Sequence, residues 1–348
     1  MKTYSLSLGL AALSALGNAA YTFRPDPASV IVDSRLPVLY NISEAQTVNS
    51  NSSGTGSYWS SSFVTGENGR QYLLLSHTLG IAASGSGYYR ASIMDLTSMS
   101  GYKSYVATGA TSTEQASKFA FEADGYGFAA LSADKYSRIR TWSDRDGVTF
   151  NVTYEATSQA IFNGAVGQFM YGDGPTHEWA LPGCRTTGSL TVGGKEIQID
   201  PSQSVSWYDR QWGEGSPTSG NWTWFELNFD DSTTKASIWM IDNADPYRRD
   251  RFATMRLESG EAKFIPVSYT PNYRKTWTSN STGIEYPLEW TIDLGDEGYL
   301  LVKSTVEDQE MAGSSKVETA YEGFVTVAGR LNKGPVTGYG IVEMVTIV

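Results

Sequence analysis

The chain has 348 residues, of which 40% are hydrophobic, and carries 37 acidic and 26 basic side chains for a formal net charge of −11. The densest basic stretch, Arg248–Arg251, is short and contains a carboxylate, so the sequence argues against binding to nucleic acid. The low charge and high aromatic content exclude a disordered chain, and the length allows one large domain or two ordinary ones.

Residues 1–20 are predicted to form a signal peptide. Lys2 provides a positive start, an apolar run from Leu6 to Leu16 follows, and small residues at 17–20 offer a cleavage site. The apolar run is shorter than the roughly 20 residues that a membrane-spanning helix needs. We therefore expect a protein without a membrane span that enters the secretory pathway or is secreted.

Five N-x-S/T sequences agree with this route. They predict glycosylation at Asn41, Asn51, Asn151, Asn221 and Asn280. Cys184 is the only cysteine, so no disulfide can form within the chain, and we expect it to be a small buried side chain. The chain is expected to be a monomer.

Most of the chain has the periodicity of β-strands. The clearest runs are rich in β-branched and aromatic residues and are separated by clusters of Gly, Asn, Asp and Ser that indicate tight turns. These runs lie at residues 71–75, 148–154, 237–241, 299–302 and 323–327. No long segment has apolar residues at helical spacing, so we predict an all-β protein of sandwich or barrel type.

A weak internal repeat predicts two β domains. Residues 58–75 and 222–241 each contain an aromatic strand, a tight turn and an apolar strand, in that order. The Gly-, Ser- and Pro-rich segment 213–220 lies just before the second copy. We therefore place the N-terminal domain at residues 21–213 and the C-terminal domain at residues 214–348.

The densest group of chemically capable residues lies between 177 and 224. Alternate residues of a strand face the same side, so His177 is expected to share a face with Trp179, and Trp207 with Asp209. If these faces point into one cavity, an imidazole and a carboxyl group share an aromatic pocket. A carboxyl group held against indole rings is desolvated, which raises its pKa and lets it act as an acid.

The other residues of this group could have a structural role in place of a functional one. Tyr208, Arg210 and Trp212 belong to the same segment as Asp209, and Trp222 and Trp224 are either pocket wall or core. His77, which follows an apolar run, is expected to be structural. We take His177, Asp209 and Tyr208 as candidate catalytic residues and assign substrate contacts to Trp179, Trp207, Arg210, Trp212, Trp222 and Trp224.

The sequence contains none of the usual cofactor motifs. There is no Gly-x-Gly-x-x-Gly between a strand and a helix, no Gly-Lys-Ser/Thr phosphate loop and no Gly-x-Ser-x-Gly elbow. A zinc site built from His and Cys would have only His77, His177 and Cys184 to draw on. We therefore expect no cofactor and assign no metal.

At these residues the chain resembles a known superfamily. His177-x-Trp179, the run Trp207–Gly213 and the closing segment 338–343 are similar to those of the AttH-like superfamily of carotenoid 1,2-hydratases, fungal kievitone hydratase and fungal Diels-Alderases. The resemblance implies two lipocalin-like β domains with a ligand pocket at or near their junction. In the carotenoid hydratases the pairs that match His177-x-Trp179 and Trp207-x-Asp209 are implicated in protonating a double bond, although Trp207 stands where that branch has a tyrosine.

The resemblance leaves three functions open. The one we place first is a Diels-Alderase-type pericyclase that folds a polyketide-derived polyene for intramolecular cycloaddition, with Tyr208, Trp179 or Arg210 polarising a carbonyl. The second is a hydratase acting on an isoprenoid or prenylated aromatic alkene, in which protonated Asp209 protonates the alkene and His177 orients or deprotonates water. The third is a lipocalin-like carrier for a hydrophobic small molecule.

Overall fold

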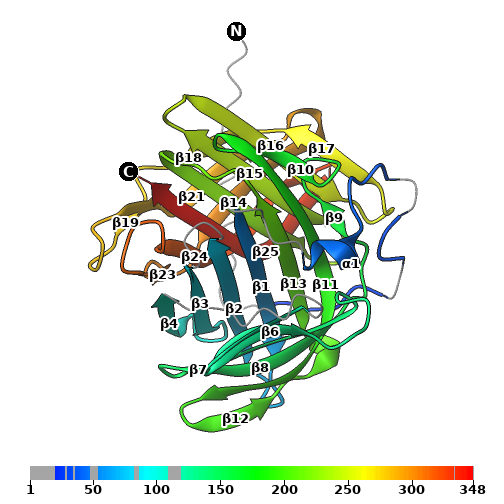
Figure 1. Cartoon of the computed structure of the whole chain (residues 1–348), viewed down its shortest axis with the longest axis vertical. Helices are drawn as coiled ribbons and strands as arrows, with labels where there is room; N and C mark the ends of the chain where they lie inside the picture. The colour runs from blue at the N-terminus through cyan, green and yellow to red at the C-terminus, as the bar shows by residue number, and fades with distance from the viewer. Residues whose placement is uncertain are drawn as a thin grey trace.

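The computed structural model describes residues 20–27, 30–33, 36–47, 54–81, 86–108, 119–332 and 334–347. The predicted signal peptide lies, except for Ala20, outside the described residues. In the described part, strands dominate, and the helical elements are short: α1 (Ile42–Ala45), η2 (Pro201–Gln203) and η3 (Gly295–Glu297). The chain forms two large antiparallel sheets and a small third one (Figure 1), which confirms the prediction of an all-β protein with two lipocalin-like domains.

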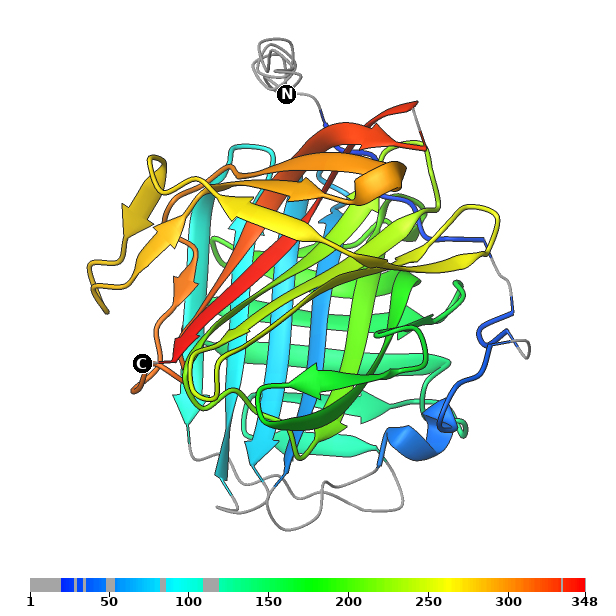
Figure 2. The ribbon, with the colours of Figure 1, turned by 90° about the horizontal axis from the view of Figure 1, so that it is seen from above.

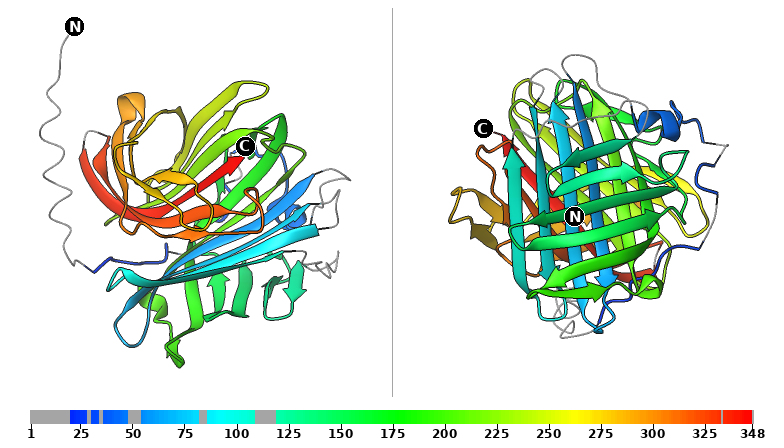
Figure 3. Two further views of the ribbon diagram at one scale, coloured as in Figure 1. Left: turned by 90° about the vertical axis from the view of Figure 1, so that its left-hand side faces the viewer. Right: turned by 60° about the horizontal axis from the view of Figure 1, so that its bottom comes forward.

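The first sheet has the order β4-β3-β2-β1-β13-β11-β8-β7-β6-β5, with β9, β10 and β12 also paired to β11. Its strands are β1 (Thr55–Thr65), β2 (Gln71–Ile81), β3 (Ser86–Asp95), β4 (Ser100–Thr108), β5 (Ala120–Ala123), β6 (Tyr126–Ala130), β7 (Arg138–Arg145), β8 (Val148–Glu155), β9 (Ile161–Phe162), β10 (Gln168–Tyr171), β11 (Gly174–Val192), β12 (Lys195–Gln198) and β13 (Val205–Gly213). The sheet folds over itself, so that β6–β8 cross one face of the long strands β1–β3 (Figure 3).

The second sheet has the order β17-β16-β15-β14-β25-β24-β22-β21-β18, with β23 paired to β24. Its strands are β14 (Gly220–Phe229), β15 (Lys235–Asn243), β16 (Arg248–Arg256), β17 (Ala262–Pro266), β18 (Ser268–Pro271), β21 (Glu289–Asp293), β22 (Gly298–Ser304), β23 (Glu310–Met311), β24 (Ala320–Leu331) and β25 (Gly334–Ile347). The third sheet pairs β19 (Thr276–Thr278) with β20 (Glu285–Pro287). Figures 2 and 3 show the second sheet lying across the long strands of the first.

Three apolar clusters form the core. One fills the fold of the first sheet and contains Tyr89 and Phe128, a second lies between the two large sheets and contains Trp59 and Phe324, and a third fills the second sheet. Because apolar side chains pack on both sides of them, β1, β13 and β14 are buried along most of their length. The outer strand β8 alternates buried and more exposed residues instead, as a strand with one packed face does.

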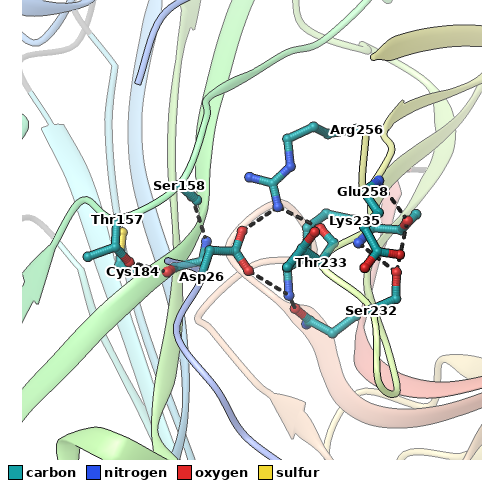
Figure 4. Close-up of polar contacts among 12 residues, drawn as sticks. Asp26, Thr157, Ser158, Cys184, Ser232, Thr233, Lys235, Arg256 and Glu258 are labelled. Atoms are coloured by element: carbon teal, nitrogen blue, oxygen red, sulfur yellow. Dashed lines mark hydrogen bonds and ion pairs between the residues drawn. The ribbon is translucent and has the colours of Figure 1, made fainter. Parts of the chain in front are cut away.

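The segment before α1 crosses the junction between the sheets. Phe23 packs in the apolar cluster between them, and Asp26 forms ion pairs with Arg256 and Lys235 of the second sheet (Figure 4). On its other side, the Asp26 backbone N–H donates to the carbonyl of Gly183 on β11, 3.0 Å away. This segment therefore joins the two sheets through a buried ionic contact. Within the described residues, no helix has the length and apolarity needed to cross a membrane.

Candidate active site

Strand register places one row of side chains across the first sheet. In β11, β13, β1, β2 and β3, successive cross-strand partners are Ala180, Asp209, Trp59, His77 and Arg90. Directly paired residues of antiparallel strands point to the same face. The side chains of this row therefore lie on the face toward the second sheet.

A parallel row on the same face runs through Glu178, Gln211, Ser57, Leu79 and Tyr88. Glu178 is thus two residues from Ala180, the partner of Asp209, and the two acidic residues are diagonal neighbours. Diagonal neighbours lie within reach of each other's side chains.

The second sheet also has a row of cross-strand partners on the face toward the first sheet. Across β15, β14, β25 and β24 the cross-strand partners are Trp239, Trp224, Glu343 and Glu322, and Trp222 lies two residues before Trp224 on the same face. The two sheets meet face to face, so aromatic and acidic groups of the second sheet lie opposite the rows of the first.

The rows enclose a cavity of about 90 Å³, which is several times the space that one water needs. Its walls combine four indole rings with ionisable and amide groups from both sheets. The lining residues are Thr55, Ser57, Trp59, His77, Leu79, Tyr88, Arg90, Tyr171, Glu178, Asp209, Gln211, Ser216, Trp222, Trp224, Trp239, Val317, Glu343 and Ile347. An apolar cavity with a few converging polar groups is the usual form of a small-molecule site.

Asp209 and Glu178 are the two acids of the first sheet that line the cavity. Burial raises the pKa of Asp209 well above its usual value, against the opposing effect of the Trp207 indole N–H, which donates to Oδ2 at 3.0 Å. Burial likewise raises the pKa of Glu178, and the nearby charge of Asp209 raises it further. Buried carboxyl groups with raised pKa values retain a proton near neutral pH.

Arg90 is the centre of a second polar group. Its Nη2 lies 3.3 Å from Glu322 Oε1, 3.1 Å from Glu343 Oε1 and 2.7 Å from His77 Nδ1. Glu322 also accepts from the Trp59 indole N–H at 2.9 Å. Arg90 and Glu322 have no exposed side-chain surface, so this contact between the two sheets is fully desolvated.

These contacts set the charges of the group. Burial and the Arg90 charge lower the pKa of His77 to about 4, so the imidazole is neutral and its Nδ1 accepts from Arg90. Burial and the Glu322 charge raise the pKa of Glu343 to about 8. Burial would also raise the pKa of Glu322, but the charge of Arg90 and the hydrogen bond from the Trp59 indole N–H outweigh it and lower that pKa.

Ligand atoms of His77, Glu322 and Glu343 lie within 4.8 Å of one another, a spacing that would suit a metal ion. Arg90 Nη2 is in direct contact with the same three side chains. The guanidinium thus supplies the positive charge at this position. The three side chains that could ligate a metal ion already contact Arg90.

Several polar atoms of the cavity lining are buried without a hydrogen-bond partner among the described residues. Acceptors of this kind are Asp209 Oδ1 and Glu178 Oε2, and donors are Nε1 of Trp222 and Trp239, Nε2 of Gln211, and Nε and Nη1 of Arg90. Unsatisfied buried polar groups are costly, so their concentration around one cavity points to a site that water or a polar ligand completes.

Of the predicted site residues, Asp209, Trp207, Trp222 and Trp224 lie on the faces that meet between the sheets, and all but Trp207 line the cavity. Trp207 lies behind it and donates to Asp209.

The prediction that His177 and Asp209 share a cavity is wrong. Register pairs His177 with Trp212, and their rings stack with centroids 5.1 Å apart on the opposite face of the sheet. Trp179 and Tyr208 are in the core of the first domain, where the Tyr208 hydroxyl donates to Gln46 at 2.8 Å.

Arg210 also lies on the far face, with its guanidinium over the Tyr58 and Trp212 rings. His177, Trp179, Tyr208, Arg210 and Trp212 are therefore separated from the cavity by the sheet itself. Their predicted catalytic and substrate contacts have no support in this geometry.

The sequence reasoning missed Glu178, Arg90, Glu322 and Glu343, and it assigned His77 only a structural part. Glu178 carried a signal, because it lies between the two residues of the His177-x-Trp179 motif and so faces the other way. The others are brought together by pairing between distant segments, as with Arg90 and Glu343.

Four sequon asparagines are described, and all are exposed: Asn41, Asn151, Asn221 and Asn280. Asn41 caps α1, where its side chain accepts from Ser43 and Glu44 N–H groups. Asn51 lies outside the described residues. Glycosylation at all five stays a prediction.

Comparison with known proteins identifies relatives over nearly the whole chain. A family model described as AttH-like matches residues 89–346. Kievitone hydratase of Fusarium solani subsp. phaseoli is 40% identical over 96% of this chain and 94% of its own length, and dehydratase asqC of Emericella nidulans is 36% identical over 96% of both. The crystal structure of kievitone hydratase from Nectria haematococca has a TM-score of 0.86 and 37% identity, covering 94% of this chain and 98% of that one.

These relatives correct the expectation of a Diels-Alderase-type pericyclase. Both curated relatives are named for the addition or removal of water, and the solved structure is that of a hydratase. The cavity agrees with this correction, because it is lined by carboxyl groups with raised pKa values, which a cycloaddition does not require.

Proposed function

The chain belongs to the AttH-like family, and we propose that it is a hydro-lyase that adds water to, or removes it from, an isoprenoid or prenylated aromatic compound. Its relatives named as a hydratase and a dehydratase support this class of reaction, and kievitone is the first substrate to test. The observation that carries the proposal is the pair Glu178 and Asp209, two buried carboxyl groups with raised pKa values in an indole-lined cavity. A carboxyl group kept protonated in this way is a general acid.

Hydration would proceed in two steps. The proton held by Glu178 and Asp209 moves to one alkene carbon, forming a C–H bond and leaving a cation at the more substituted carbon. The π faces of Trp222, Trp224 and Trp239 stabilise positive charge there. Water then forms the C–O bond, and the proton it loses returns to the carboxylate pair, so that the net change is addition of water to the double bond. Dehydration is the same sequence reversed.

The cavity also favours a particular part of the substrate. At about 90 Å³ it has room for a branched alkenyl group and a water, but the larger body of a prenylated aromatic has to extend toward the mouth. Among the lining residues, Thr55, Ser216 and Ile347 are partly exposed.

The purified protein tests the reaction directly. We would incubate it with kievitone and with 2-(3-methylbut-2-enyl)phenol in water enriched in heavy oxygen, and analyse the products by mass spectrometry. The expected product carries one added water with the heavy label. If both compounds, and the corresponding tertiary alcohols, come back unchanged, the protein is not this hydro-lyase, and the carrier alternative gains support.

We also propose that residues 1–20 direct the chain into the secretory pathway. The apolar run after Lys2 and the exposure of Asn41, Asn151, Asn221 and Asn280 support this route. Expression in a secreting fungal host, followed by treatment with an endoglycosidase, tests it. We expect a protein in the medium that begins near residue 21 and loses mass on treatment; an unglycosylated protein retained inside the cell would contradict the proposal.

A further inference from the structure

We propose that the indole N–H of Trp239 binds the oxygen atom that is added to or removed from the substrate, holding it between the second sheet and Glu178. The inference rests on the proposed hydro-lyase function and adds the water subsite to it. It assigns to Trp239 a hydrogen bond to the reacting oxygen, beyond the stabilisation of positive charge that any indole ring provides.

The first observation is a donor and an acceptor that lie close together, while neither has a well-formed hydrogen bond. Trp239, on β15, lies close enough to Glu178, on β11, for its N–H to lower the pKa of that carboxyl group. Yet Trp239 Nε1 and Glu178 Oε2 are both buried and have no hydrogen-bond partner. A ligand oxygen in the cavity that both residues line could accept from the indole and donate to the carboxyl group.

The second observation is that Trp239 could not be satisfied by solvent. Only 4% of its surface is exposed, and Glu178 is 1% exposed. Buried indole N–H groups usually find a partner. Both atoms belong to residues that line the same cavity, so the group that completes them has to occupy it.

The third observation is a matched contrast within the same sheet. Trp224 is the cross-strand partner of Trp239 and lines the same cavity, but its N–H donates to Ser237 Oγ at 2.8 Å. The two indoles therefore offer similar π surfaces, whereas only that of Trp239 has an N–H available for a ligand.

The chemistry of the oxygen fits this position. In hydration, a water accepts from Trp239 and donates to Glu178, which leaves one lone pair to form the C–O bond; the released proton passes to the Glu178 carboxylate. In dehydration, the hydroxyl oxygen of the alcohol accepts from Trp239 and takes the acid proton, and the C–O bond breaks to release water. The carboxylate left behind then takes a proton from the neighbouring carbon, which forms the alkene. The Trp239 N–H donates to the oxygen in both directions and is not consumed.

The test compares Trp239→Phe with Trp224→Phe, since phenylalanine keeps an aromatic face and removes the N–H. Binding of 2-(3-hydroxy-3-methylbutyl)phenol and 2-(3-methylbut-2-enyl)phenol would be measured by calorimetry. We expect W239F to weaken alcohol binding about tenfold, as loss of one hydrogen bond to a buried donor does, with much smaller loss for the alkene. W224F should weaken both ligands by similar factors.

Kinetics give a second readout. In W239F, kcat for hydration should fall while KM for the alkene changes little, and the fall of activity at high pH should move to higher pH, because the N–H lowers the pKa of Glu178. Equal selectivity between alcohol and alkene in W239F and W224F would overturn the assignment.

A measurement on the unmodified protein keeps the test independent of how W239F folds. With ¹⁵N-labelled tryptophan, the alcohol should shift the Trp239 indole N–H resonance strongly and the alkene should not, while the Trp224 resonance responds to neither or to both alike. If the alcohol leaves the Trp239 resonance unmoved, the inference fails. Failure of the unmodified protein to turn over any alkene or alcohol would instead count against the proposed function.

Discussion

Glu178 and Asp209 stand on adjacent strands, each with one carboxyl oxygen bound and the other without a partner. Asn163 donates to Glu178 Oε1 at 2.8 Å, and Trp207 donates to Asp209 Oδ2 at 3.0 Å, while Glu178 Oε2 and Asp209 Oδ1 are unpaired. The bound oxygens fix the orientation of each carboxyl group. The unpaired oxygens remain to carry and receive a proton.

Removal of this acid is the first test of the mechanism. Asp209→Asn keeps the shape of the side chain but cannot donate a carboxylic proton, so we predict a fall in kcat of about 10²–10⁴-fold, the usual contribution of a general acid. Turnover of kievitone or a prenylated phenol gives the rate, and thermal unfolding checks that the fold is kept. Asp296→Asn, at an exposed position in η3, serves as the matched control. Full activity in D209N would exclude Asp209 as the acid.

His177 provides the opposite test. Its ring stacks on Trp212 on the face of the sheet away from the cavity, and burial lowers its pKa. Because the sheet separates it from the reacting groups, His177→Phe is expected to retain kcat and its pH profile, with only a change in stability. A loss of kcat as large as that in D209N would show that the imidazole reaches the reaction by a path that this structure does not provide.

Glu343 predicts a pH dependence of stability. Its pKa is about 8 in the folded protein against 4.5 for a free carboxyl group, so the folded state holds a proton that the unfolded state has lost between these values. Stability from this group is therefore full below about pH 4.5 and is lost as the pH rises toward 8. The free energy of unfolding of Glu343→Gln should fall less steeply over this range than that of the unmodified protein.

Urea titrations at several pH values measure this difference. Glu258→Gln, at an exposed position, is the control and should keep the slope of the unmodified protein. Parallel pH profiles for all three proteins would show that Glu343 has no raised pKa.

The contact between Arg90 and Glu322 predicts coupled effects on stability. Arg90→Met removes the positive charge and leaves the Glu322 carboxylate buried among apolar rings, so we expect a loss of about 3–5 kcal/mol. The double variant R90M/E322Q should lose less than R90M alone, because no unpaired charge remains. Chemical denaturation of the two single variants and the double variant measures the coupling, and strictly additive losses would argue against a direct pair.

A similar loss of stability is expected when the ion pairs of the N-terminal segment are broken. Asp26→Ala leaves Arg256 and Lys235 buried without their carboxylate, and we expect destabilisation of about 3–5 kcal/mol (Figure 4). D26A/R256M should recover part of this loss. If D26A has the same free energy of unfolding as the unmodified protein, the ionic contact between the sheets contributes little to stability.

The sequence was sufficient for the fold class because strand periodicity and turn residues are local signals. It also located Asp209, Trp222 and Trp224, since acidic and aromatic residues on alternate positions mark one face. It could not tell which face of β11 shares a cavity with which face of β13. Both faces of these central strands are packed, so the hydrophobic pattern does not mark an inside, and only the pairing of Ala180 with Asp209 decides it.

The acidic residues of the second sheet were beyond such reasoning for a different reason. Glu322 and Glu343 become partners of Arg90 only when two sheets, assembled from opposite halves of the chain, are stacked. Contacts of this kind depend on how the domains dock, for which a single sequence carries no periodic signal.

The cavity between the sheets has a consequence for the order in which its walls are assembled during synthesis. Glu178 and Asp209 are in place once the first domain has folded, but three of the indoles belong to strands made later, and Glu343 is on β25, the last strand, which inserts between β14 and β24. A nascent chain that lacks its final fifteen or so residues, about the length of one long strand, therefore has an unfinished sheet and an open, water-filled acid pair. The cavity around the acid pair is therefore complete only when β25 has joined the second sheet.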